Sequence, residues 1–291
     1  MAKRIGDIRI GISGWRYPPW RGVFYPKGLR QKDELAFAAS KFRSLEINGT
    51  FYGLMRPENF ADFAAATPDD FVFTIKAPRF ITHTRRLREI EAPVANFLAS
   101  GLLRLGPKLG PILWQFPPSF RFDLARIEPW LALLPHTTAA AAELARGHDS
   151  RLAGRAWAET DADRPLRHAM EIRHESFRTP EFVALLRKYG VALVCADTVE
   201  WPRLMDVTAD FVYCRLHGSE QLYASGYTPA ALDEWAVRLR AWARGGEPAG
   251  AERAGGPGPK LPSRDIFLFF DNDLKVRAPA DAAALVERLT A

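Results

Sequence analysis

Eight short apolar segments recur along the chain, and most of them end in a polar or charged residue. They are rich in β-branched and aromatic residues, as β-strands are, and most of the stretches between them are long enough for a helix. Alternating strands and helices predict a parallel sheet, and about eight such units predict a closed (β/α)8 barrel of the TIM type. The predicted strands cover residues 8–13, 44–48, 71–77, 111–116, 167–174, 191–198, 211–218 and 265–272.

The length of the chain agrees with one such barrel. It has 291 residues, of which 47% are hydrophobic and 25% charged, so we predict a single domain over residues 1–291. The Ala-rich stretch 139–159 predicts a helix, and so does 229–244. The Gly- and Pro-rich stretch 245–263 predicts a flexible loop, on the side of the barrel away from the site.

The composition also bears on where the protein works. No apolar run is long enough to span a bilayer, and the basic N-terminus lacks the apolar stretch of a signal peptide. The two cysteines, Cys195 and Cys214, fall inside separate predicted strands, as reduced core thiols do. We therefore expect a cytoplasmic protein without a membrane partner. Its net charge of +6 favours anionic partners, but weakly.

Strand periodicity sorts the polar residues. Side chains alternate between the two faces of a strand, and the outer face of a barrel strand must be apolar because helices pack on it. Polar side chains near the strand ends should therefore point into the barrel at its C-terminal end, where barrel enzymes keep their chemistry. The residues predicted at this mouth are Glu46, Asn48, Lys76, Gln115, Glu171, Arg173, His174, Asp197, Arg215, His217, Asp271 and Asn272.

The predicted mouth holds both signs of charge. Buried charges are costly unless they are paired, so we expect Glu46 to pair with Lys76, and Asp197 to lie between the cations of the fifth and seventh strands. One interpretation is a structural lattice of ion pairs that fixes the register of the barrel. The other is a preorganised polar pocket, which the gathering of the charges at one end favours.

Carboxylates beside His and Arg suit acid–base chemistry on an anionic substrate. The candidate catalytic residues are Glu46, Glu171, Asp197 and His217. Lys76, Arg173 and Arg215 are candidates to bind a phosphate or carboxylate, with further ligand contacts from the side chains around them. These further candidates are Asn48, Gln115, His174, Asp271, Asn272 and His83.

Metal and cofactor sites are not favoured. Of the six histidines, His83, His174 and His217 stand at suitable positions, and the Arg and Lys residues among them would repel a divalent cation. The chain has no Walker loop and no GxGxxG, GxSxG or HExxH motif. We therefore expect neither a metal nor a cofactor.

Aromatic residues gather with arginine in the predicted loops. Such rings either form stacking platforms for bases or sugars, or pack the loops over the barrel as an apolar cap. The candidate ligand contacts among them are Trp15, Tyr17 and Tyr52. Both interpretations stay open for these three residues and for Trp20. An arginine run after the third strand is either a solvated helix start or a phosphate-steering patch, and comprises Arg79, Arg85, Arg86 and Arg88.

Seven segments in order resemble the motifs of the domain-of-unknown-function family 72. They are GISGWRYPPWRGVFYP (11–26), LEINGTFY (45–52), FTIKAPRFITH (73–83), LWQFPPSF (113–120), EIRHESF (171–177), FVYCRLHG (211–218) and FFDND (269–273). The resemblance runs from near residue 8 to near residue 285 and implies a (β/α)8-type barrel, without an established activity. Gly49 departs from a pattern that often has Ser after Asn48, and the variant ending leaves the roles of Asp273 and Lys275 open.

The leading functional hypothesis is a metal-independent enzyme that uses acid–base chemistry on a phosphate- or carboxylate-bearing small molecule or nucleotide. The first alternative is a nucleic-acid-binding protein or a nuclease-like phosphodiesterase that uses the aromatic and arginine loops. The second alternative is a non-catalytic scaffold whose polar mouth is structural.

Overall fold

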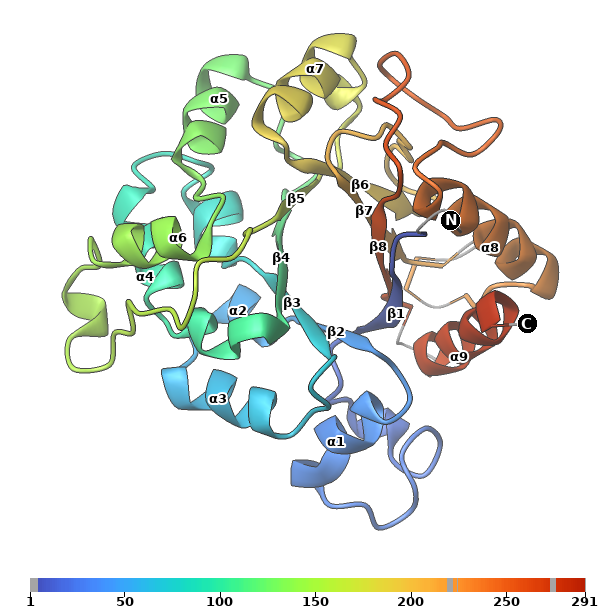
Figure 1. Ribbon diagram of the computed structural model, residues 1–291, viewed down its shortest axis with the longest axis horizontal. Helices are drawn as coiled ribbons and strands as arrows, with labels where there is room; N and C mark the ends of the chain where they lie inside the picture. The colour runs from blue at the N-terminus through green and yellow to red at the C-terminus, as the bar shows by residue number, and fades with distance from the viewer. Residues whose placement is uncertain (1–4, 219–221, 224, 273–275, 291) are drawn as a thin grey trace.

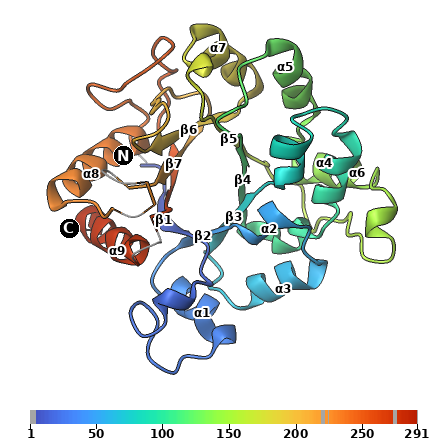
Figure 2. The same cartoon turned by 180° about the vertical axis from the view of Figure 1, so that it is seen from behind.

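Eight parallel strands close into a barrel in chain order, with β8 pairing to β1. The computed structural model describes residues 5–218, 222–223, 225–272 and 276–290. Figure 1 shows the strands as a ring with the helices outside it, and Figure 2 shows the same ring from behind. The predicted TIM-type barrel is confirmed. The strands are β1 (Ile8–Ser13), β2 (Ser44–Ile47), β3 (Val72–Lys76), β4 (Leu109–Gln115), β5 (His168–Glu171), β6 (Ala192–Asp197), β7 (Phe211–Leu216) and β8 (Asp265–Phe270).

Helices of unequal length connect the strands. Local chemistry sets their ends: Thr179 Oγ1 accepts a hydrogen bond from Phe182 N at the start of α7, and Gly190 ends that helix with a φ of 62°. The predicted helix 139–159 is shorter in the structure and ends at Ala145. The helices are α1 (Glu34–Ala39), α2 (Gly49–Tyr52), α3 (Pro57–Ala65), α4 (Glu91–Leu98), α5 (Leu124–Leu133), α6 (Thr138–Ala145), α7 (Pro180–Tyr189), α8 (Pro229–Ala243) and α9 (Arg277–Thr290). No helix in these described ranges is both long and apolar enough to cross a membrane.

The β6–β7 connection, residues 198–210, contains no helix. The segment 245–263 packs there instead, between α7 and α8 in Figure 1. Asp206 accepts hydrogen bonds of 2.8 Å from the backbone N–H groups of Ala254 and Gly255. The Gly- and Pro-rich segment therefore takes the place of a helix on the outside of the barrel, although it has neither helical nor strand structure itself.

The interior of the barrel is layered. Apolar side chains fill its middle and lower part, from Leu113, Ala169, Val194, Phe211, Tyr213, Phe267 and Phe269. The alternating residues of the same strands face outward into the core beneath the helices. The charged layer of the mouth, around Arg215, lies above these apolar side chains at the C-terminal end of the strands. At the opposite end, Arg9 and Arg167 lie over the rings of Phe267 and Phe211.

Close packing inside the barrel also constrains β1. A Cβ atom added to Gly11 would lie 2.0 Å from the backbone oxygen of Ser44 on β2, which is far inside van der Waals contact. Glycine at this position is therefore what allows the two strands to approach.

We predict that Gly11→Ala lowers the free energy of unfolding by roughly 1–3 kcal/mol, because the methyl group must push β1 away from β2. The measurement is urea unfolding of wild type and variant. Gly53→Ala is the matched control, because Gly53 has an extended φ of −172° and nothing within 4 Å of an added Cβ. Equal stability of the two variants would contradict the packing argument.

Candidate functional site at the barrel mouth

Arg215, on β7, is the centre of the charged layer. Its guanidinium is fully buried and contacts three carboxylates that come from β2, from β5 and from the end of β8. Nη1 lies 2.7 Å from Oε2 of Glu171, and Nη2 lies 2.9 Å from Oε1 of Glu46 and 2.8 Å from Oδ2 of Asp271. Nε donates a further hydrogen bond of 3.1 Å to Glu46. The guanidinium therefore joins distant parts of the chain inside the barrel.

Glu46 is held by two further donors. The hydroxyl of Tyr213 donates to Oε2 at 2.7 Å, and the hydroxyl of Ser13 donates to Oε1 at 3.0 Å. The hydroxyl oxygen of Thr74 in turn lies 2.9 Å from that of Tyr213, within hydrogen-bond distance. Burial raises the pKa of Tyr213 well above its ordinary value, and Glu46 adds to the shift, so the phenol stays protonated.

Glu171 connects Arg215 to a second arginine. Its Oε1 accepts from Nε2 of Gln115 at 2.9 Å and from Nε of Arg173 at 2.8 Å. The Arg173 guanidinium lies 4.0 Å from the centre of the Trp201 ring, which covers one of its faces. Burial alone would raise the pKa of Glu171, but Arg215 and Arg173 more than offset it and hold that pKa well below its ordinary value. Glu171 is therefore an ionised carboxylate.

A histidine and a carboxylate form the part of the layer above Arg215. Nδ1 of His217 lies 3.1 Å from Oδ2 of Asp271, and its Nε2 lies 3.8 Å from Oε2 of Glu171. The buried imidazole contacts the rings of Trp201 and Tyr223, with centroids 5.3 and 5.5 Å away. Burial opposes ionisation of Asp271, but Arg215 and His217 outweigh it and lower its pKa. His217 thus stands between two ionised carboxylates.

Lys76, at the end of β3, differs from the two arginines. Its side chain is buried, yet its Nζ has no hydrogen bond or carboxylate within ion-pair distance in the described ranges, and lies 4.3 Å from the centre of the Phe51 ring. Burial, and then Arg215, lower the pKa of Lys76 to about 8, although the three carboxylates oppose this. The predicted pair of Glu46 with Lys76 is therefore wrong, because the carboxylate oxygens of Glu46 accept hydrogen bonds from Arg215 and from two hydroxyl groups instead.

His83 lies on the same side of the mouth as Lys76. Its ring is 5.1 Å from the Phe51 ring in an edge-on arrangement. Burial lowers its pKa to about 4, and Lys76 and Arg173 add to the shift. The imidazole is therefore neutral at pH 7 and faces a cationic side of the layer.

Asp197 and Asn272 point outward, not into the mouth. Asp197 binds Arg203 at 3.0 Å and accepts a hydrogen bond of 3.3 Å from the Trp235 indole of α8. Asn272 donates to Oδ2 of Asp281 on α9 at 2.8 Å. The predicted position of Asp197 between the strand-five and strand-seven cations is thus wrong.

Two other candidates have local contacts. Nδ1 of His174 accepts a hydrogen bond of 3.0 Å from Ser176 N and so caps a short turn. Asn48 precedes α2, and its buried Oδ1 has no hydrogen-bond partner among the residues that the structure describes.

The aromatic loop residues are divided. Trp15 and Trp20 are buried, and Trp15 packs edge-on against Phe63 at 5.1 Å, which agrees with the cap interpretation for both. The hydroxyl of Tyr17 donates to the backbone oxygen of Ser13 at 2.7 Å and so ties the loop to the end of β1. The side chain of Tyr52 is 76% exposed.

The predicted arginine run is also divided. Arg85 pairs with Glu89, and Arg86 donates to the backbone oxygen of Ser119 at 2.7 Å. Arg79 is exposed and contributes to the electrostatic surroundings of His83. These contacts agree with a solvated segment more than with a single patch.

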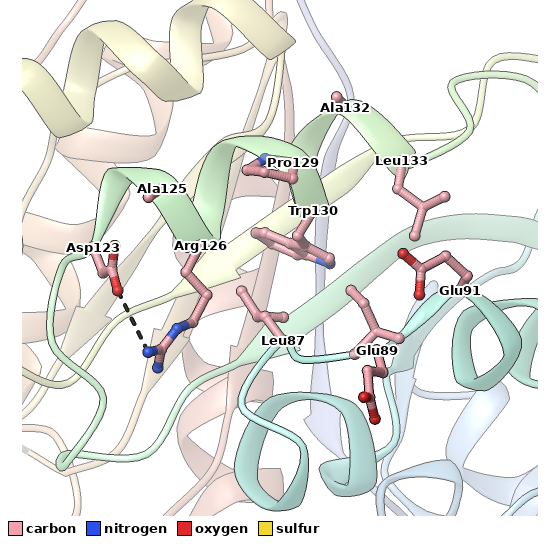
Figure 3. A pocket seen from close by; sticks show the side chains of 11 residues that line it. Leu87, Glu89, Glu91, Asp123, Ala125, Arg126, Pro129, Trp130, Ala132 and Leu133 are labelled. Carbon is pink, nitrogen blue, oxygen red and sulfur yellow. Dashed lines mark ion pairs between the residues drawn. The ribbon is translucent and has the colours of Figure 1, made fainter.

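Two cavities differ in their relation to the charged layer. One of about 160 Å³ adjoins the mouth, with Phe51 as a wall, and its other lining residues include Tyr52, Arg79, Phe80 and Arg151. Another, of about 520 Å³, lies outside the barrel between α5 and the segment 87–91, and Figure 3 shows Arg126 and Trp130 of α5 across from Leu87 and Glu89. Its lining includes no residue of the charged layer, so we do not assign it to the site.

Among the side chains that the structure describes, no group of three or more His, Cys, Asp and Glu is arranged to hold a metal ion. The carboxylates that converge do so on a guanidinium. Asp273 and Lys275, whose roles the sequence left open, lie outside the described residues.

A family comparison agrees with this barrel and its motifs. The sequence model described as "Protein of unknown function DUF72" matches residues 9–291. The chain belongs to the DUF72 family. The resemblance drawn from the seven motifs is thereby confirmed.

Individual relatives of this DUF72 chain cover less of it. It is 33% identical over 113 residues to the UPF0759 protein YecE of Escherichia coli K12, which is 39% of either chain. It is 31% identical over 119 residues to the UPF0759 protein YunF of Bacillus subtilis, 39% of this chain and 41% of that one. The match thus spans about two fifths of the length of these curated relatives.

Solved structures of other DUF72 proteins share the fold. One from Thermotoga maritima has a TM-score of 0.73 at 23% identity and covers 98% of this chain and 100% of its own. One from Enterococcus faecalis has a TM-score of 0.66 at 17% identity and covers 99% of both chains. At these identities the likeness establishes the barrel and nothing about its chemistry.

We predict that Arg215→Met lowers the free energy of unfolding at pH 7 by about 3–5 kcal/mol, because it removes the cation that Glu46, Glu171 and Asp271 share and leaves only Glu171 with another arginine, Arg173. Glu171 and Asp271 have lowered pKa values, so their contribution is present above their unfolded pKa and is lost as the pH falls through the folded one. The loss should therefore shrink in acid, which urea unfolding at several pH values measures. Arg146→Met, at an exposed pair with Glu143, should change stability little. A deficit that does not vary with pH would contradict the role of the charges.

A second prediction uses the lowered pKa of Lys76. Between about pH 8 and 10.5 the folded state has released this proton while the unfolded state still holds it, so the free energy of unfolding rises with pH. Over this pH range, the free energy of unfolding of wild type should rise by roughly 3 kcal/mol more than that of Lys76→Met. The difference between their unfolding curves isolates Lys76, because all other titrating groups are shared. Parallel pH profiles would show that Lys76 titrates normally.

Proposed function

We propose that this DUF72 protein is a cytoplasmic, metal-independent enzyme that uses acid–base chemistry on a small molecule bearing a carboxylate or phosphate. The observation that carries the proposal is Lys76. In a purely structural lattice each buried charge would have an opposite charge against it, as Arg215 has. The ammonium of Lys76 has no such partner in the described part of the chain, and its place suits a ligand anion.

Acid–base groups adjoin this place. Glu171 and Asp271 are held ionised by the arginines and lie 3.8 and 3.1 Å from the two ring nitrogens of His217, so they orient its imidazole. His217 is the group suited to accept or donate a proton. Glu46 and Arg215 have their polar atoms engaged with one another, and we assign them the positioning of the reactive groups.

The binding side of the mouth is cationic and aromatic. Lys76 and Arg173 supply the positive charge that would attract the substrate anion, and neutral His83 would donate or accept a hydrogen bond. The 160 Å³ cavity behind Phe51 has room for a small apolar part of the same substrate. We accordingly favour a small molecule over a polymer.

The nucleic-acid alternative ranks second. Exposed Tyr52 and Phe80, with Arg79 and Arg151 around one cavity, support it because such rings and cations stack on bases. The burial of Trp15 and Trp20 removes two rings from the same role. The scaffold alternative ranks third, since it explains Arg215 but not Lys76.

We expect phosphate or sulfate to raise the melting temperature of wild type, and Lys76→Met to abolish the effect. At an anion concentration a hundred times its Kd, the stabilisation would be about 2.7 kcal/mol. The effect should weaken as the pH rises through about 8, because the ammonium then loses its charge. Thermal unfolding with increasing anion at constant ionic strength measures it.

Lys108→Met is the matched control for this experiment. Lys108 is buried to the same extent as Lys76, 8% exposed, but its Nζ donates to the backbone oxygens of Ala64 and Thr67. Its removal should lower stability and leave the anion response intact. A wild type whose melting temperature does not respond to either anion would rule out the proposed function.

A further inference from the structure

Two buried lysines in this chain have opposite environments. Nζ of Lys108 lies 2.6 Å from the Ala64 oxygen and 2.7 Å from the Thr67 oxygen, so its ammonium is solvated by the protein. Nζ of Lys76, at the end of a barrel strand, lies 4.3 Å from the centre of the Phe51 ring and has no hydrogen-bond acceptor among the described residues. A buried amine without such acceptors is destabilised as a cation and is correspondingly easier to use as a neutral nucleophile.

We propose that Lys76 is an amine nucleophile, which forms an imine with the carbonyl carbon of a small aldehyde or ketone that carries a carboxylate or phosphate. The inference rests on the proposed function and names its substrate class. The anionic group would be held by Arg173, and the carbonyl carbon would lie against Nζ of Lys76.

The step balances without an oxidant or reductant. The free amine of Lys76 adds its lone pair to the carbonyl carbon, and a proton passes from nitrogen to oxygen to give a carbinolamine. The carbon–oxygen bond then breaks and the oxygen leaves as water, which takes both of its hydrogens from the amine. The resulting imine takes up one proton and becomes a cation.

The charge layer suits this cation. A protonated imine has the same charge as the ammonium it replaces, so the balance between Lys76, Arg173 and Arg215 and the three carboxylates is kept. Its positive charge withdraws electrons from the neighbouring carbon, which makes a proton there easier to remove. His217, which lies 3.1 Å from Asp271 and 3.8 Å from Glu171, is the group suited to remove it.

The lowered pKa of Lys76 increases the fraction of its side chain that is free amine at pH 7. With a pKa of about 8, roughly a tenth of Lys76 is free amine at pH 7. An ordinary lysine with a pKa near 10.4 has roughly two-hundredfold less. Lys76 should therefore react with a small carbonyl compound ahead of the exposed lysines.

The test is reductive trapping on the folded, full-length protein. The probe is glyoxylate, an aldehyde that carries a carboxylate, with cyanoborohydride at pH 7, followed by peptide mapping for carboxymethyl-lysine. We expect Lys76 to be labelled at least tenfold faster than exposed lysines such as Lys27 and Lys41, and Lys108 to stay unlabelled. In protein denatured before the reaction, this preference should disappear.

The outcomes separate this inference from the function on which it rests. Lys76→Arg keeps the charge, so it should retain the phosphate response and lose the label. If wild type shows a phosphate response that depends on Lys76 but labels only its exposed lysines, the imine proposal is overturned and the proposed function stands. If wild type shows neither the label nor the response, both fall.

Discussion

The ion pairs of Arg215 with Glu46, Glu171 and Asp271 are the constraint on which the top of the barrel depends. The guanidinium is fully buried, and each carboxylate comes from a different third of the chain. Removing such charges from water costs several kcal/mol apiece unless geometry and further hydrogen bonds compensate. Tyr213, Ser13 and Gln115 supply those hydrogen bonds, and so the layer is ordered rather than merely neutral.

This arrangement divides the cations into two kinds. Arg215 and Arg173 donate hydrogen bonds to carboxylates, and they hold Glu171 ionised. Lys76 is left at the edge of the same layer, where burial and the nearby guanidinium weaken its hold on a proton. The structural and the functional interpretation of the mouth are therefore not exclusive, because the lattice around Arg215 is what makes Lys76 unusual.

Much of the site follows from the alternation of side chains along a strand. Glu46, Lys76 and Glu171 lie inside the barrel as their positions predict, and the same rule would also have found Thr74 and Tyr213, two residues before Lys76 and Arg215. The same rule would have excluded Asp197 and Asn272 from the mouth. Each lies two residues after a side chain that faces outward, Cys195 on β6 and Phe270 on β8, and so faces outward as well. These two were placed at the mouth because they end strands, without regard to the face they occupy.

The sequence by itself determined the eight strands, their closure into a barrel and the end at which charge gathers, because strand periodicity is local. It could not determine which charges pair. Glu46 and Arg215 are 169 residues apart, and their contact depends on the distance across the closed barrel. Glu46 and Lys76, on neighbouring strands, look like the natural pair in sequence, yet only the tertiary structure gives Glu46 to Arg215 and leaves Lys76 without a carboxylate against it.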